Sequence, residues 1–161
     1  MKTYQLQVEQ TVSRPLPEVF PFFADARNLE RITPPWLHFS ILSTDLEMRA
    51  GLRIDYQLKL HGFPLRWQSE ITVWEPPHRF VDEQRRGPYR LWRHEHRFYA
   101  EGTSTRLVDE VTYAVWGGWL LHPLWVRRDL EKIFSYRQQI IAQIFGSSSL
   151  PMPDEQAEQR A

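Results

Sequence analysis

The sequence predicts an α+β fold in which a curved antiparallel sheet of about seven strands wraps around a long C-terminal helix. Polar and apolar residues alternate over residues 4–12, and again in successive segments between residues 37 and 115, which is the period of half-buried strands. From residue 122 to residue 146 the apolar residues recur at helical spacing instead. Because the apolar face of a sheet must be covered, this long helix is its expected cover.

The segment after the first strand predicts two short helices. Val19, Phe20 and Phe23 form an apolar stripe, and Pro21 inside it predicts a short or kinked helix. The stretch ARNLERI, residues 26–32, predicts a second short helix, which the following TPP ends.

The strands that follow are predicted from their alternation and from the turns between them. The motifs HGFP, EPPH, RGPY and EGTS contain the Gly, Pro and Ser residues of tight turns, and their close spacing predicts antiparallel hairpins. A turn at Gly62 and Phe63 would pair Leu58 with Trp67, which keeps the apolar faces of the two strands together.

Length and composition limit the classes of protein. At 161 residues the chain has the length of one domain, expected over residues 1–146, followed by a disordered polar tail over residues 147–161. Basic and acidic residues both number 20, which argues against nucleic acid as a partner. The sequence has no cysteine, which excludes disulfides, thiolate nucleophiles and cysteine-based metal centres.

The apolar segments and the aromatic residues bear on location and on ligands. No stretch reads as a secretory signal or reaches the roughly 20 apolar residues of a spanning helix, so we expect a cytoplasmic protein without stable membrane insertion. Aromatic residues make up 14% of the chain, with 7 tryptophans. A tryptophan-rich core and a cavity for a flat or apolar molecule both explain this content, and cores are the commoner of the two.

The stretch LWRHEHRFY, residues 91–99, has two different faces in a strand. Trp92, His94, His96 and Phe98 share one face, and the charged residues between them share the other. Because the charged set belongs in water, both histidines are predicted to face inward.

The turns on either side of this strand give each histidine a candidate aspartate. The turn EGTS would pair His96 with Asp109, and a plausible register across RGPY places His94 beside Asp82, with Gln84 on the same inner face. A buried carboxylate needs a partner, and histidine is a suitable one. These side chains are therefore predicted to form a polar region on an otherwise apolar surface.

Four segments, which together span most of residues 3–146, resemble a known family: NLERITPPWLHF, WEPPHRFVDEQRRGPYRLWRHEHRF, VDEVTY and LHPLWVRRDLEKIFSYRQQ. The sequence is similar to the SRPBCC (START-like) superfamily, and within it to a bacterial ligand-binding subgroup that is polyketide cyclase/dehydrase-like. The resemblance implies the helix-grip fold, with a cavity between the sheet and the C-terminal helix. It supplies no catalytic set, because this fold hosts carriers, sensors and enzymes alike.

We therefore expect the protein to bind or transport a small hydrophobic molecule, aromatic or lipid-like, without a cofactor. The polar end of the ligand would be held by Asp82, Gln84, His94, His96 and Asp109. The rest of the ligand would be held by Trp67, Phe80, Trp92, Phe98, Tyr113 and Phe134.

Three alternatives remain open. An enzyme of polyketide cyclase/dehydrase type could use His96 with Asp109, or His94 with its aspartate, as an acid/base pair. The Trp-rich segment 116–125 could serve as a protein-interaction surface or hold a homodimer. A metal site of two histidines and one carboxylate is the least favoured, since a satisfied polar network explains the same residues.

Two further aromatic residues, Trp36 and Tyr136, lie outside these sets. Trp36 is either a core anchor or a lip of the cavity mouth. Tyr136 could point its hydroxyl into the cavity, where a buried phenol would need a partner.

Overall fold

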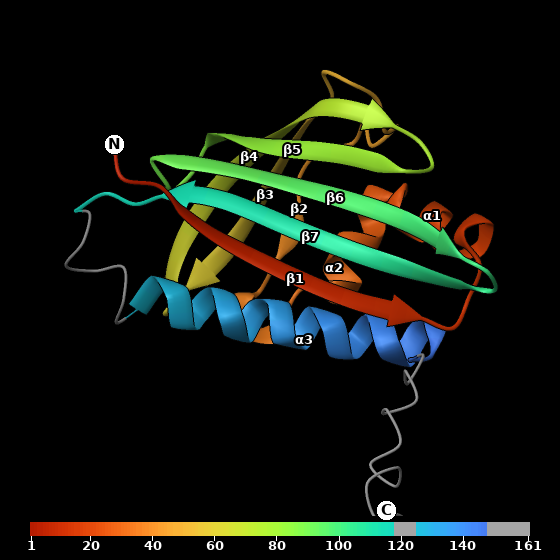
Figure 1. The fold of residues 1–161 in the computed structure, drawn as a ribbon. Coiled ribbons are helices and arrows are strands. Elements are labelled where there is room, and N and C mark those ends of the chain that lie inside the picture. The colour runs from red at the N-terminus through yellow and green to blue at the C-terminus, as the bar shows by residue number, and fades with distance from the viewer. Residues whose placement is uncertain (118–124, 148–161) are drawn as a thin grey trace, which may run out of the picture.

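The computed structural model describes residues 1–117 and 125–147, and it confirms the predicted fold class. Within these residues, seven strands form one antiparallel sheet in the order β1-β7-β6-β5-β4-β3-β2 (Figure 1). The strands are β1 (Tyr4–Val12), β2 (Ser40–Ile41), β3 (Arg53–Leu60), β4 (Phe63–Glu75), β5 (Arg79–Arg86), β6 (Leu91–Glu101) and β7 (Ser104–Ala114).

The long C-terminal helix α3 (Arg127–Phe145) lies along the sheet, as the helical spacing predicts (Figure 1). Leu130, Phe134 and Ile141 on its inner side are buried. Of the predicted tail only Ser147 is described, and it pairs with Val12 at the end of β1.

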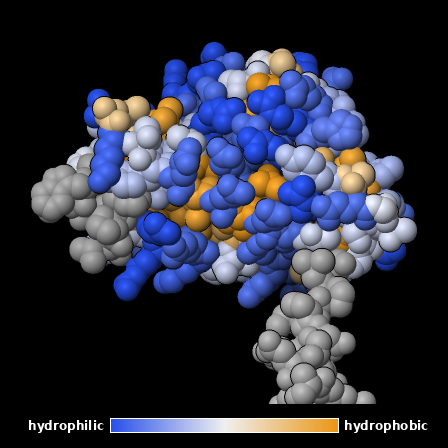
Figure 2. Space-filling view, in the orientation of Figure 1, coloured by the Kyte–Doolittle hydropathy of each residue, from blue (hydrophilic) through white to orange (hydrophobic). Residues whose placement is uncertain are grey.

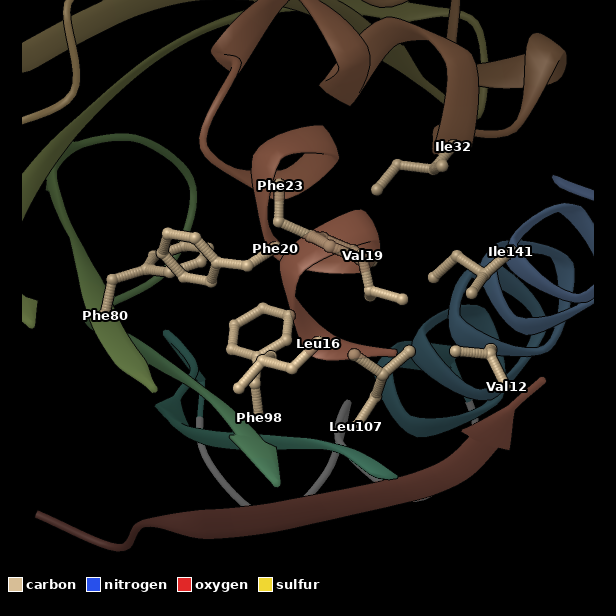
Figure 3. Packing of buried hydrophobic residues seen from close by; sticks show 10 residues of the cluster. All are labelled: Val12, Leu16, Val19, Phe20, Phe23, Ile32, Phe80, Phe98, Leu107 and Ile141. Carbon is tan, nitrogen blue, oxygen red and sulfur yellow. The ribbon is translucent and has the colours of Figure 1, made fainter. Parts of the chain in front are cut away.

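The two predicted short helices are α1 (Leu16–Phe23) and α2 (Leu29–Ile32), and Pro21 lies inside α1. Single turns of 3-10 helix, Ala26–Asn28 and Pro35–Leu37, extend this connection. Side chains from α1, α2, β5, β6, β7 and α3 meet in a hydrophobic core (Figure 3).

The register of β6 and β7 is the predicted one. His96 lies opposite Asp109, and Phe98 lies opposite Leu107. The pairing of Asp82 with His94 across β5 and β6 is also confirmed. Strand alternation excludes a slip by one residue, which would turn the apolar face into water, and the positions of the turns EGTS and RGPY favoured the register that is observed.

The predicted register of β3 and β4 is wrong by two residues. Leu58 lies opposite Leu65, and Trp67 lies opposite Tyr56. The hairpin turns on His61 and Gly62, both with positive φ (49° and 82°), which is the conformation of a two-residue primed turn. A slip of two residues keeps every side chain on its predicted face, so the apolar pattern alone could not detect it.

Carried across the turn EPPH, the alternation of the sequence places Val73 beside Phe80, and this prediction is wrong. Between Ile71 and Val73 the pairing with β5 shifts at a bulge, so that Val73 lies opposite Val81 and Trp74 lies opposite Phe80. A bulge adds one residue to one strand and so exchanges the faces beyond it. Trp74, rather than Val73, therefore packs against Phe80, with ring centroids 5.7 Å apart.

The outer face of β6 differs from expectation at Glu95. Its residue exposure is 5%, although the charged set of this strand was expected in water. Arg79, Arg93 and Arg97 cover the carboxylate and donate hydrogen bonds to it at 2.7–2.8 Å.

Most side chains on the molecular face drawn in Figure 2 are hydrophilic, with hydrophobic ones showing toward its middle.

The Trp-rich segment 116–125 is described only at its ends. Trp116 and Trp125 are 64% and 60% exposed. Residues 118–124 lie outside the described part of the chain, so the interaction surface and the homodimer remain predictions.

Candidate ligand-binding site

A cavity of about 220 Å³ lies between the sheet and the inner side of α3. Its wall is mainly apolar and aromatic, and includes Ile54, Trp67, Phe80, Trp92, Ile133 and Phe134. Trp67 and Trp92 meet edge to face with ring centroids 5.4 Å apart, which fixes the orientation of both rings. The strands and the helix thus supply a rigid apolar wall.

Most of the proposed ligand contacts line this cavity. They are Trp67, Phe80, Asp82, Trp92, His94, His96 and Phe134. The other four residues lie elsewhere. Phe98 belongs to the core of Figure 3, and Tyr113 packs in a separate buried cluster with Phe134. Gln84 donates to and accepts from the backbone of Tyr89, so its amide closes the turn before β6.

Asp109 does not line the large cavity, since it lies beyond the histidines beside a smaller hollow. Together with Asp82, His94, His96 and Arg137 it forms what we call the inner-face cluster. This cluster joins side chains from β5, β6, β7 and α3 at one wall of the cavity.

The hydrogen bonds of the inner-face cluster run diagonally across the strand pairs. His94 Nε2 lies 2.8 Å from Asp109 Oδ1, and His96 Nε2 lies 3.1 Å from Asp82 Oδ2. These diagonal bonds add to the predicted pairs, in which His94 Nδ1 lies 3.7 Å from Asp82 Oδ2 and His96 keeps its contact with Asp109. His96 Nδ1 also approaches Asp109 Oδ1 to 2.9 Å, so His96 touches both carboxylates.

The two imidazole rings lie against each other, with centroids 3.7 Å apart. Phe80 stacks on the ring of His96 at 4.1 Å, and Phe134 meets His94 edge to face at 5.4 Å. The histidines are therefore held by rings on one side and by carboxylates on the other.

Arg137 of α3 is the member of the cluster that the sequence interpretation missed. Its exposure is 8%, and its Nη2 lies 3.5 Å from Asp109 Oδ1 and 3.4 Å from His96 Nδ1. The signal was present in the sequence, because Arg137 follows Phe134 and precedes Ile141 at helical steps on the buried face.

The sequence left open whether the neighbouring Tyr136 reaches the cavity, and it is not among the lining residues. Its ring meets that of Trp36 edge to face, with centroids 5.6 Å apart. Trp36 itself is 50% exposed and also does not line the cavity. These two aromatic residues support each other away from the cavity wall.

Burial and charge act in opposite directions on the carboxylates of the cluster. Burial raises the pKa of Asp109, but the charge of Arg137 and the bonds from the histidines outweigh it and hold this pKa well below its usual range. Burial likewise raises the pKa of Asp82, but the hydrogen bond with His96 and the charges of His94, His96 and Arg137 together outweigh it, so the net shift is downward. Both carboxylates are therefore ionised at neutral pH.

The two histidines differ in their affinity for a proton. Burial, helped by the charge of His96, lowers the pKa of His94. Burial also lowers the pKa of His96, but its contacts with Asp109 and Asp82 outweigh this and raise the pKa overall. His96 therefore takes up the proton first, and its charge together with that of Arg137 balances the two carboxylates.

One group among the described residues has the geometry of a possible metal site. It consists of Asp82, His94 and His96, whose potential ligand atoms all lie within 4.8 Å of one another. Two histidines and a carboxylate suit a transition metal. The same atoms already bond to partners inside the cluster, and Arg137 places a positive charge beside His96. The cluster can therefore balance its charge with one proton, and we assign no metal to it.

A second, neutral network lies on the same wall of the cavity. The hydroxyls of Tyr56 and Ser69 are 2.9 Å apart, and Trp67 Nε1 donates to Ser69 Oγ at 3.1 Å. Burial and the charge of Asp82 raise the pKa of Tyr56 well above its usual value, so this phenol stays neutral. The network orients the ring of Trp67 in the wall.

Comparison with known proteins agrees with this architecture. The family model described as polyketide cyclase / dehydrase and lipid transport matches residues 12–137, so the chain belongs to this family, within the SRPBCC superfamily. A search of the curated proteins found no match to the sequence.

Solved structures with the same fold come from bacteria and plants. A protein from Mycobacterium smegmatis is 18% identical, with a TM-score of 0.65 over 89% of this chain and 96% of that one. The ginseng major latex-like protein 151 from Panax ginseng is 10% identical, with a TM-score of 0.66 over 89% and 97%. The Zhui aromatase/cyclase from a Streptomyces species is 15% identical, with a TM-score of 0.65 over 92% and 100%. At these identities the likeness shows the fold alone.

Within residues 1–117 and 125–147, no helix combines the length and the apolar character needed to cross a bilayer.

Proposed function

We propose that the protein binds or transports a small hydrophobic molecule, aromatic or lipid-like, inside the cell, in the cavity between the sheet and α3. The observation that carries this proposal is the cavity itself, about 220 Å³ with a mainly aromatic and aliphatic wall and one charged cluster. Binding sites for small molecules commonly combine an apolar wall with a few polar groups that fix orientation. Membership of a family described by cyclase, dehydrase and lipid transport functions supports it further.

The size of the cavity limits the ligand. Sites for drug-sized ligands measure roughly 300–1,000 Å³. A cavity of about 220 Å³ therefore suits a compact molecule, such as one with one or two rings. Its apolar part would lie against Trp67 and Trp92, and its polar end against the inner-face cluster.

A neutral two-ring fluorescent probe, 1-naphthylamine, tests the cavity directly. We expect saturable binding, because the apolar probe gains burial against the aromatic wall. Ile133→Trp adds bulk to the cavity wall and should weaken binding by about tenfold or more. The measurement is a fluorescence titration, with thermal unfolding of each variant recorded in parallel.

Ile140→Trp is the matched control. Ile140 lies two turns further along α3, is also half-buried, and packs against the core cluster outside the cavity lining. It should leave probe affinity within about twofold. Absence of saturable binding to the wild type, or equal losses in the two variants, would refute the proposal.

Native mass spectrometry of the protein purified from its own host identifies the natural occupant. We expect a small molecule that co-purifies and that the apolar probe displaces. An empty protein under several growth conditions would count against a carrier.

Catalysis of the cyclase/dehydrase type is the second candidate function. The observation that favours it is that two histidines, each within hydrogen-bond distance of a carboxylate, line the cavity. Such pairs can move protons during enolisation, cyclisation or loss of water. Incubation with the co-purified molecule or its hydrated precursor should then yield a product lacking one water, and His96→Gln should abolish this. Unchanged turnover in both His96→Gln and Asp109→Asn would exclude the role.

A further inference from the structure

The guanidinium of Arg137 has fewer hydrogen-bond partners than a buried cation requires. Arg137 is 8% exposed and lines the cavity. A guanidinium carries five N–H donors. Among residues 1–117 and 125–147, only its Nη2 finds acceptors, at 3.4 and 3.5 Å, and its Nε is buried with no partner.

The charged groups around Arg137 do not complete its bonding. Asp109 Oδ1, which Nη2 approaches at 3.5 Å, also lies 2.8 Å from His94 and 2.9 Å from His96, so this oxygen is already shared. Asp82 bonds to His96 rather than to Arg137. On its remaining side the guanidinium lies over the ring of Phe23, 5.8 Å from the ring centroid, and an aromatic face accepts no strong hydrogen bond.

A molecule held in the cavity is therefore well placed to supply an acceptor for Arg137. Among the described residues no acceptor other than Asp109 and His96 bonds to its side chain, which reaches the cavity from α3, across from the strands. A buried donor left unbonded is costly, so a site that leaves one open gains affinity and selectivity for a molecule that supplies the acceptor.

We propose that Arg137 anchors the ligand through an acceptor oxygen on an sp² carbon, that of a ketone, ester or carboxylate, next to the one or two rings that fill the cavity. This inference rests on the proposed binding function and specifies its ligand class. The planar fork of the guanidinium suits such an oxygen better than a point charge would. The inner-face cluster then has two roles. The histidines and aspartates position Arg137, and Arg137 donates hydrogen bonds to the ligand.

Three naphthalenes of similar shape test this assignment. They are 2-acetylnaphthalene, 2-naphthoate and 2-isopropenylnaphthalene, in which a methylene replaces the ketone oxygen. Their affinities are measured by isothermal titration calorimetry with the wild type and with Arg137→Met. We expect Arg137→Met to weaken at least one oxygen-bearing compound by about tenfold, and to leave the hydrocarbon within about twofold.

The comparison between the two oxygen-bearing compounds separates a neutral from an anionic acceptor, because only the naphthoate is charged. Arg137→Lys keeps the charge but not the planar fork, so it should retain only part of the preference. Arg128→Met, an exposed arginine on the same helix, is the matched control and should change none of the affinities.

These measurements distinguish a failure of the Arg137 anchor from a failure of the proposed binding function. If Arg137→Met weakens all three compounds equally, or weakens none, the anchor is refuted while binding stands. If none of the three binds the wild type, the cavity proposal fails and the anchor fails with it. Unchanged binding of the hydrocarbon to Arg137→Met shows that the variant is folded.

Discussion

Strand β6 carries a buried charged cluster on each of its two faces, and the clusters differ in how well they are satisfied. On the outer face Glu95 receives short hydrogen bonds from Arg79, Arg93 and Arg97, at 2.7–2.8 Å. On the inner face the contacts of Arg137 are 3.4 and 3.5 Å long, and its Nε has no partner among the described residues. The carboxylate on the outer face of β6 is thus fully hydrogen-bonded, whereas the guanidinium on the inner face lacks part of its hydrogen bonds.

This difference indicates that the outer cluster mainly stabilises the fold and that the inner cluster is suited to binding. Each arginine of the outer cluster is about one-third exposed, so water completes its bonding without a ligand. Arg137 is buried at a cavity wall, where a molecule bound in the cavity can complete its bonding. A satisfied buried network stabilises the fold, and an unsatisfied one beside a cavity is the better candidate for a binding site.

The largest expected effect is the loss of stability when the outer cluster is broken. Burial raises the pKa of Glu95, but the hydrogen bonds from the arginines outweigh it and bring the pKa to about 2, against an ordinary 4.5. Glu95→Gln should therefore lower the free energy of unfolding by about 3 kcal/mol at pH 7, as measured by urea denaturation.

Glu83→Gln is the control for this substitution. Glu83 is partly exposed and has longer contacts with Arg85 and Arg93, so it should lose about 0.5 kcal/mol or less. Equal losses in the two variants would show that the outer cluster is no more than a surface ion pair.

The stabilisation by Glu95 should also depend on pH. Because the folded pKa of about 2 lies below the unfolded value near 4.5, the stabilisation is complete above about pH 5. It is lost progressively as the pH falls from about 4.5 through 2. Urea denaturation of the wild type and Glu95→Gln should give a stability difference that shrinks over this range. A difference that stays constant down to pH 2.5 would contradict the assignment.

The inner cluster should be less sensitive to the loss of its arginine. Arg137→Met removes two long contacts and a donor without a partner, while Asp109 keeps both histidines. We expect a loss of about 1 kcal/mol, measured by denaturation in the absence of ligand. A loss as large as that of Glu95→Gln would mean that Arg137 is mainly structural.

The smallest effect is expected in the neutral network of the inner face. Tyr56→Phe removes a hydroxyl bonded to Ser69, which keeps its bond from Trp67 Nε1. The expected loss is about 0.5 kcal/mol by thermal unfolding. Ser69→Ala would take away the partner of both groups and should cost more. The reverse order would show that Tyr56 contributes through contacts other than this bond.

Strand periodicity was sufficient to predict much of the fold and part of the site. It placed Trp92, His94 and His96 on the inner face of one strand, and the paired strands brought Asp82 and Asp109 beside them. It could not predict the register of the hairpin at His61 and Gly62, because a slip of two residues leaves every face unchanged. It also could not predict the bulge after Ile71, because Val73 and Trp74 are both apolar and either could face inward.

What the sequence by itself determined is the class of fold and the face of each β6 side chain, because side-chain direction in a strand follows from position alone. Only the tertiary structure decided which groups meet. The diagonal bonds of His94 and His96 depend on side-chain rotation. The presence of Arg137 depends on how α3 lies against the sheet. Distances between elements far apart in the chain are set by packing, so the incomplete hydrogen bonding of Arg137 could be recognised only in the tertiary structure.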